Sequence, residues 1–426
     1  RSLVGSEMCI RDSTDTYSDL IKNWRELEEK ASSDAKYSNI LGATKIWGAY
    51  LFQRLTDIYG NVPYSEAGLG YYQQIYKPKY DNQETIYKDM IQQVKDGVNL
   101  LNANNPAIDG DLFYDGDINK WKKFGGSLLL RIGMRLSEVA PDLAKQTVAD
   151  AVTIGVMSQP EDICLLRHDG SGKNAFKNPL SFRYLDDNFI ESDAVKIGKT
   201  FMDYLKKTKD PRIHVYCSLK DGNTEFDKQF GLPNGYDSHT IADAPSGSFV
   251  GLENTSNFNI NTILRLDAPT IFLMPSETKL LLAEAVLRNW TNGNAEVLYK
   301  EAITSSMKEQ EIAYGTQGKI TDEEIETYLA QNLLSTANNT EKLQIIGEQY
   351  WVATFINGYE SYANWRRTGY PKLIPTNYSG SMSPGVIPTR LPYPTDEYSI
   401  NRANVDTANQ QQGADKVTTH IWWDID

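Results

Sequence analysis

Carboxylates are the side chains here that could most readily do chemistry, because the chain has 56 Asp and Glu residues against 43 Lys and Arg. Two carboxyl groups placed on either side of a glycosidic bond can hydrolyse it. Adjacent pairs such as Asp186-Asp187 and Glu323-Glu324 do not make such a site, since neighbouring side chains on a helix point apart. A pair assembled from distant loops stays open, so a helical glycoside hydrolase or lyase is one alternative.

Other catalytic patterns are incomplete. The stretch 169–174 (DGSGKN) resembles a phosphate-binding loop, but Arg167 replaces its first glycine and Asn174 its final Ser or Thr. The sequence has no GxSxG motif. The four histidines form no HExxH or HxH motif, and they are His168, His214, His239 and His420. We therefore predict no catalytic residue, no metal site and no cofactor.

A group of aspartates, Asp109, Asp111, Asp115 and Asp117, is dense enough to suggest a calcium loop. Its spacing differs from the EF-hand pattern, however. Turn and helix-cap roles explain these residues as well, and we favour them.

Aromatic rings are the better candidates for function, since 25 residues are Tyr. Tyr71, Tyr72 and Tyr76 lie close together in a polar loop, where they could stack on the CH face of a sugar or simply pack the loop. A second set of binding candidates lies in an irregular segment and comprises Phe176, Phe182 and Tyr184, with Arg183 between them.

A third aromatic cluster contains Trp365, Arg366, Arg367 and Tyr370. It could bind a sugar or a carboxylate. We favour a buried ion-pair and cation–π cluster that includes Glu284 or Glu360.

Two further aromatic groups have simpler explanations. Tyr59, Pro63 and Tyr64 could line a groove, but a turn that ends a buried helix is favoured. Trp422 and Trp423 could anchor the C-terminal tail or contact a partner, and anchoring needs no partner.

Helical periodicity predicts the elements that position these residues. Apolar residues recur at three- and four-residue steps over about 43–58, 84–101, 118–132 and 141–154, and again from 275, 295, 321 and 341. Asp117 is a candidate N-cap, and Thr321 with Glu324 forms a capping box. The predicted fold is mostly α. The helices at 275 and 295 have the length of a tetratricopeptide-like pair, and those at 43 and 84 could form another.

The domain organisation follows from these segments. Residues 13–426 form one domain, helical over 13–156 and 270–370 and loop-rich over 157–269, with short strands possible at 213–219. The tail, 371–426, is rich in Pro, Asn and Gln and is predicted to be ordered coil wrapped on the helices. Residues 1–12, including Cys9, have no amphipathic period, and we interpret them as a foreign leader.

Charge and composition exclude several classes of function. A net charge of -13 repels phosphate backbones, so no nucleic-acid partner is expected. Three cysteines are too few and too scattered for a disulfide framework. The sequence contains neither a membrane-spanning apolar run nor a signal peptide.

Separated blocks along the chain resemble the SusD/RagB family of nutrient-binding outer-membrane lipoproteins. The blocks are 50–67 (YLFQRLTDIYGNVPYSEA), 78–81 (PKYD), 116–124 (GDINKWKKF), 128–136 (LLLRIGMRL), 282–285 (LAEA), 357–360 (NGYE), 365–371 (WRRTGYP) and 388–394 (PTRLPYP). Their number and order make coincidence improbable.

The resemblance implies an α-superhelix of tetratricopeptide-like helix pairs with a loop-rich second part. It also implies a non-catalytic cell-surface lipoprotein that captures an oligosaccharide or another small nutrient for a SusC-like TonB-dependent transporter. Contact with the outer membrane would come only through a lipidated cysteine, which we expect upstream of this chain. A helical-repeat scaffold for a protein partner is a further alternative.

Overall fold

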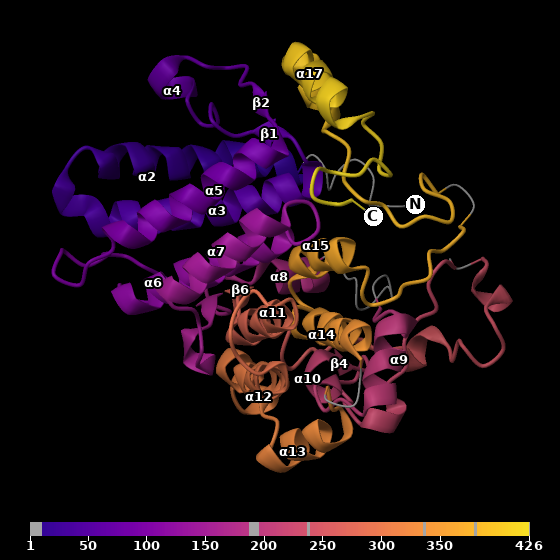
Figure 1. Ribbon diagram of the computed structural model, residues 1–426. Coiled ribbons are helices and arrows are strands. Elements are labelled where there is room, and N and C mark those ends of the chain that lie inside the picture. Colours follow the sequence, from indigo (N-terminus) through magenta and orange to yellow (C-terminus); the bar gives the residue numbers. More distant parts are fainter. Residues whose placement is uncertain (1–10, 187–195, 237–238, 335–337, 379–380, 426) are drawn as a thin grey trace.

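Helices make up most of the computed structural model of this chain, which describes residues 11–186, 196–236, 239–334, 338–378 and 381–425 (Figure 1). A π-helical segment, Arg11–Ile21, leads directly into the first α-helix. The α-helices are α2 (Lys22–Ser32), α3 (Ser38–Tyr59), α4 (Gly70–Gln73), α5 (Gln83–Leu100), α6 (Ile118–Arg135), α7 (Pro141–Ile154), α8 (Pro179–Asp186), α9 (Lys199–Thr208), α10 (Ile213–Tyr216), α11 (Pro275–Leu287), α12 (Ala295–Tyr314), α13 (Asp322–Gln331), α14 (Asn339–Ala353), α15 (Gly358–Thr368), α16 (Thr395–Ile400) and α17 (Arg402–Gln412).

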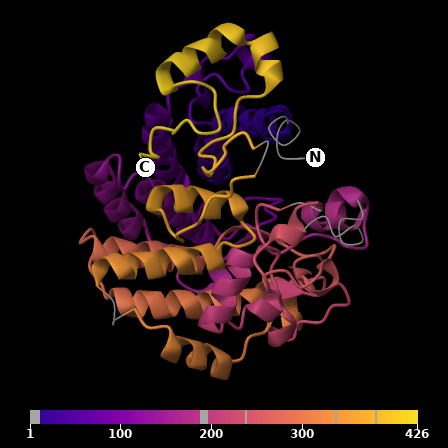
Figure 2. The same ribbon diagram turned by 90° about the vertical axis from the view of Figure 1, so that its right-hand side faces the viewer.

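Helix pairs form the body of the molecule, which confirms the mostly α prediction. Helix α3 packs on α5, α6 on α7, and α11 on α12. The predicted starts are also confirmed, because the Asp117 carboxylate accepts hydrogen bonds from Asn119 N and Lys120 N, and Thr321 with Glu324 forms the capping box of α13. Figure 2 shows α11, α12 and α14 stacked in the lower half, with the C-terminal segment over the top.

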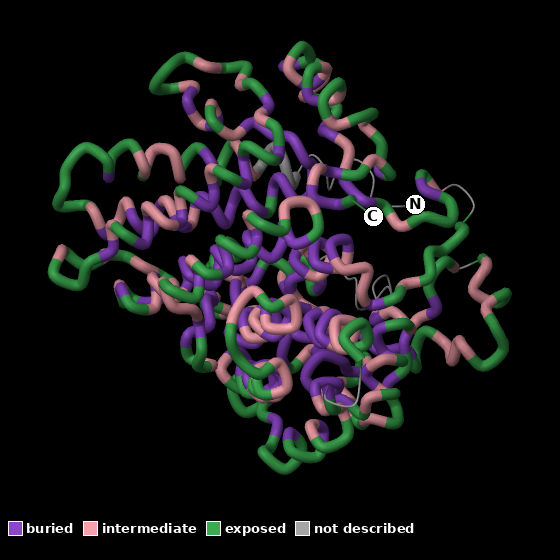
Figure 3. The backbone as a smooth tube through the Cα atoms, in the orientation of Figure 1, coloured by how far each residue is buried: buried purple, intermediate pink, exposed green. Residues whose placement is uncertain are grey.

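Helix α3 is the centre of this body. From Gly48 to Gly60 every residue is buried except Arg54, so this helix is surrounded by protein on nearly all sides (Figure 3). It ends at Gly60, which adopts a positive φ of 80°. The chain then continues into the short strand β1 (Val62–Pro63). The turn role favoured for Tyr59, Pro63 and Tyr64 is thereby confirmed.

The loop-rich middle segment contains more helix than the sequence pattern predicted. Helices α8, α9 and α10 all fall within 157–269. The strand proposed for 213–219 was wrong over most of its length, because Ile213–Tyr216 forms one helical turn and only Cys217–Ser218 (β4) is extended. Buried Arg212, just before this turn, donates to Ser306 on α12 and Gln349 on α14, and these tertiary contacts override the β preference of Ile213 and Val215.

Strands are few and short in the described residues, and all pair antiparallel. Strand β1 pairs with β2 (Tyr80–Asp81), β3 (Cys164–Leu166) with β6 (Thr270–Leu273), and β4 with β5 (Asn257–Phe258). The β3–β6 pair joins the two ends of the loop-rich segment and thereby holds β6 against the helices.

The C-terminal tail was predicted as coil, and this was wrong for two stretches, α16 and α17. Val405 and Ala408, one helical turn apart on α17, are fully buried, but polar residues around them hide this period. The wrapping itself is confirmed. Tyr393 Oη donates to Asn61 O at 2.6 Å, and Leu391 N donates to Ile58 O at 3.0 Å.

Across the described ranges, no helix is long and apolar enough to cross a lipid bilayer. The proposed leader, 1–12, with Cys9, lies almost wholly outside the described residues, which begin at Arg11.

Candidate functional site

A groove of ≈ 590 Å³ opens where β6 and α15 meet the loop-rich segment. Its lining residues are largely apolar and aromatic, and they come from α3, α8, β6, α12, α15 and the tail: Arg54, Ile58, Asn178, Pro179, Leu180, Ile263, Pro269, Thr270, Ile271, Phe272, Tyr314, Ile356, Asn357, Gly358, Tyr359, Tyr362 and Leu391. Its volume suits a small ligand, and a mostly apolar lining with a few polar groups is typical of binding sites. We call these residues the groove.

Rings and cations lie together on one wall of the groove. The Arg54 guanidinium carbon lies 3.5 Å from the centroid of the Tyr359 ring, which places a cation flat against an aromatic face. Tyr362 follows Tyr359 by one helical turn on α15 and stacks on Trp365 at 6.2 Å between centroids. This wall therefore combines aromatic rings with a hydrogen-bond donor, Arg54.

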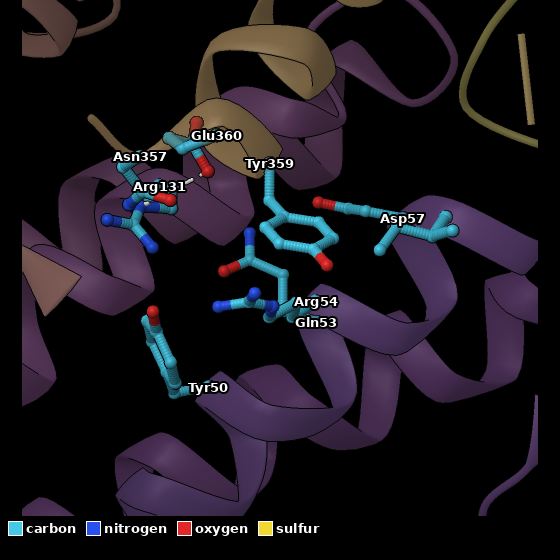
Figure 4. Close-up of a pocket in the computed structure, with 9 residues that line it drawn as sticks. Tyr50, Gln53, Arg54, Asp57, Arg131, Asn357, Tyr359 and Glu360 are labelled. Atoms are coloured by element: carbon cyan, nitrogen blue, oxygen red, sulfur yellow. Dashed lines mark ion pairs between the residues drawn. The ribbon is translucent and has the colours of Figure 1, made fainter. Parts of the chain in front are cut away.

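A small recess continues the groove towards the core, and the two share Arg54, Ile58, Asn357 and Tyr359. Its other lining residues are Tyr50, Gln53, Asp57, Arg131 and Glu360. Figure 4 shows the Gln53 amide and the Arg54 guanidinium beside the Tyr359 ring, with Arg131 and Glu360 above and to the left of that amide. We call this space the recess.

Buried ion pairs fix the recess in place. Arg131 on α6 donates to Glu277 on α11, with a distance of 2.5 Å between Nε and Oε1. Arg135 Nη2 donates to both oxygens of Glu360 on α15 at 2.7 Å. Arg135 also pairs with Asp57 on α3 at 3.3 Å. Four helices are thus joined by charges directly beneath the groove.

The pKa values of the carboxylates in this network shift in different directions. Burial alone would raise the pKa of Glu360, but the charges of Arg135 and Arg131 outweigh it and hold that pKa below its usual value. Burial raises the pKa of Asp57 despite Arg135, and raises the pKa of Glu277 despite Arg131. These groups have a structural role, because each charged side chain pairs with one of opposite charge.

The nine binding candidates named from the sequence do not line the groove in the part of the chain that the structure describes. Tyr71 and Tyr72 lie on α4 with their ring centroids 5.2 Å apart, and Tyr76 follows. These rings are strongly exposed, at 90% for Tyr71 and 73% for Tyr76. Figures 1 and 2 place α4 at the upper end of the molecule.

The second candidate set lies elsewhere, near α8. Phe176 is 58% exposed, and Phe182 lies beneath Lys177 with 5.8 Å between Nζ and the ring centroid. Tyr184 was expected in an exposed loop, and this was wrong, because it lies on α8, is buried and packs against Phe258 at 5.5 Å. The structure therefore does not bring the α4 and α8 rings together as one site.

The third candidate set forms the buried cluster that the sequence favoured. Arg367 donates to both oxygens of Glu284 at 2.6 and 2.7 Å, which confirms the predicted ion pair. Arg366 is also buried and donates to Thr389 O and Asp57 O. Trp365 and Tyr370 are half-buried around it. Tyr370 and Arg366 line a separate polar cavity of ≈ 430 Å³ near Trp423.

The aspartates considered for calcium have local roles. Asp111 accepts hydrogen bonds from Phe113 N, Gly116 N and Trp121 Nε1. Asp117 caps α6. These contacts agree with the turn and cap roles that the sequence favoured.

Sequence reasoning missed the groove residues Arg54, Phe272, Tyr359 and Tyr362. Arg54 and Tyr359 lie inside the blocks 50–67 and 357–360 that resemble the SusD/RagB family, so the sequence did mark these two positions. A charged residue on a mostly apolar helix could have drawn attention to Arg54, as it could to Lys45 and Asp57. No local pattern could have placed Phe272 beside Tyr359, because only the fold joins β6 to α15.

Comparison with known proteins agrees with this architecture. A family model described as starch-binding and associating with the outer membrane matches residues 11–394. No match was found among curated protein sequences.

Solved structures resemble nearly the whole chain. A chitin-binding protein is 32% identical with a TM-score of 0.86, covering 99% of this chain and 89% of its own. A SusD-like protein from Bacteroidetes is 27% identical with a TM-score of 0.84, covering 98% and 90%. A chitin-binding SusD homologue from Flavobacterium johnsoniae has a TM-score of 0.80 at 24% identity, covering 96% and 85%.

Proposed function

Because the chain belongs to the SusD-like family of starch-binding proteins that associate with the outer membrane, we propose that it binds an oligosaccharide in the groove and does not cleave it. The observation that supports this most is the groove lining, which combines aromatic rings with Arg and Asn side chains. Rings stack on the CH faces of sugars, and Arg and Asn hydrogen-bond the hydroxyl groups at the ring edges.

Binding without hydrolysis follows from where the carboxylates lie. Among the described residues that line the groove, none is Asp or Glu. The acids of the adjoining recess, Asp57 and Glu360, are both bound to Arg135. A glycosidase needs two carboxyl groups free to act on either side of the scissile bond. The lining of the groove therefore supports binding better than it supports hydrolase or lyase chemistry.

The family assignment and the 32% identity to a chitin-binding protein favour a β-linked N-acetylglucosamine oligomer as the first ligand to test. Starch fragments are the second, because the family description names starch. We further propose that the bound sugar passes to a SusC-like TonB-dependent transporter. Co-purification from outer membranes should recover the pair, and recovery of this protein alone from an extract that contains the transporter would contradict it.

Calorimetric titration with tetra-N-acetylchitotetraose and maltotetraose tests the binding site. Tyr359→Ala removes a ring from the groove and should lower affinity by about five- to 150-fold for whichever sugar binds. Tyr359→Phe keeps the ring and should retain most of the affinity. Melting temperatures of both variants check that the fold is intact.

The exposed Tyr71, Tyr72 and Tyr76 cluster is the competing location, and Tyr71→Ala is the matched control. The groove encloses a ligand from several sides, whereas the Tyr71 ring is almost fully exposed. Tyr71→Ala should therefore leave affinity unchanged. Weakened binding in Tyr71→Ala with normal binding in Tyr359→Ala would move the site to α4.

A further inference from the structure

The recess below the groove contains a buried amide without a partner. Gln53 is 2% exposed, and its side-chain Nε2 makes no hydrogen bond to any described residue. A buried N–H that lacks an acceptor destabilises the protein relative to one that has it. A water or a ligand atom that supplies the acceptor would remove this cost.

The recess has room for a small group. The space open to the centre of a water molecule is ≈ 20 Å³, and about 10–15 Å³ is enough for one water. Its opening lies beside Arg54, Asn357 and Tyr359, which also line the groove. A single oxygen atom of a bound sugar's substituent can therefore enter from the groove, whereas a whole sugar ring cannot.

The two carboxylates in the recess already accept from protein donors. Asp57 accepts from Tyr87 Oη and Trp423 Nε1 and pairs with Arg135. Glu360 accepts from Arg135 Nη2 and Tyr350 Oη. What the recess offers an entering group is thus chiefly donors, with the Gln53 N–H among them.

We propose that Gln53 is a specificity-determining residue that donates to the carbonyl oxygen of an acetamido group on the bound sugar. A hydroxyl carries a hydrogen that itself needs an acceptor, and the two carboxylates of the recess are already bound to protein donors. An amide carbonyl oxygen only accepts, and so it matches this environment. The inference rests on the proposed function and names its substrate class as N-acetylated oligosaccharides.

The test compares two neutral, β-1,4-linked sugars that differ at C2, tetra-N-acetylchitotetraose and cellotetraose. The wild-type protein should bind the acetylated sugar about tenfold more tightly. Gln53→Met keeps the length of the side chain and removes the N–H, so it should abolish this preference and leave cellotetraose binding unchanged. Tyr359→Ala should weaken both sugars alike.

The outcomes separate the two proposals. If the wild-type protein binds neither these sugars nor maltotetraose, the proposed function fails. If it binds the two β-linked sugars equally, or if folded Gln53→Met keeps the preference, the role of Gln53 is overturned while sugar binding stands. A lower melting temperature of Gln53→Met with unchanged affinities would show that the recess only holds a structural water. Absence of the preference in the wild-type protein overturns the role of Gln53 even if the variant does not fold.

Discussion

At the scale of single residues, the Glu284–Arg367 pair predicts a pH dependence. Burial alone would raise the pKa of Glu284, but Arg367 and Arg288 outweigh it and lower that pKa to about 2. The pair therefore stabilises the fold fully above the unfolded value of 4.5 and loses this effect as pH falls towards 2. Glu284→Gln should lower the free energy of unfolding by about 3 kcal/mol at pH 7. Urea titrations should show this difference shrinking between pH 5 and pH 3, and a constant difference would contradict it.

The same residues show what composition and spacing can predict. An Arg-rich, aromatic stretch suggested a buried ion pair, and Arg367 with Glu284 is that pair. The rings that we propose to stack on a sugar could not be predicted in the same way. Tyr184 was expected to be exposed, but it is buried. Whether a ring faces solvent or the core depends on segments far away in the sequence.

At the scale of elements, the contact between α3 and α5 depends on two glycines. A Cβ at Gly97 would lie 2.7 Å from Gly42 O, and a Cβ at Gly42 would lie 2.7 Å from Gly97 O. Gly97→Ala should therefore destabilise the protein by about 1–3 kcal/mol, although alanine favours a helix by about 1 kcal/mol. Thermal unfolding measures this. Gly70→Ala, whose Cβ would meet its nearest atom at 3.6 Å, is the control and should be nearly neutral.

Long helices with a regular apolar period were predictable, and α5, α6 and α7 begin and end within three residues of the expected positions. Short or polar helices were not. Helix α17 has Val405 and Ala408 as its only buried residues, so its amphipathic signal is weak. Its position is set by the tail folding back onto the body.

At the scale of the whole molecule, the C-terminal tail fastens the helical body together. Trp423 is 1% exposed, and its Nε1 donates to Asp57 Oδ1 at 2.9 Å. The Arg366 guanidinium carbon lies 4.5 Å from the centroid of the Trp423 ring. Trp423→Ala should cost about 3–5 kcal/mol, measured by urea unfolding. Ile425→Ala, at a residue 58% exposed, should change stability by less than about 0.5 kcal/mol. Equal effects at the two positions would contradict an anchoring role.

The overall organisation was predictable because the recognised blocks extend along most of the chain in a fixed order. The groove was not, since it forms where α3, β6, α8, α15 and the tail converge. Residues from 54 to 391 line it, and no local window of sequence contains that information.

A crystal structure of the protein with tetra-N-acetylchitotetraose tests the central claim most directly. We predict sugar density in the groove, with one ring against Tyr359 or Tyr362 and an acetamido oxygen within hydrogen-bond distance of Gln53 Nε2. Density at Tyr71 and Tyr76 with an empty groove would contradict the account.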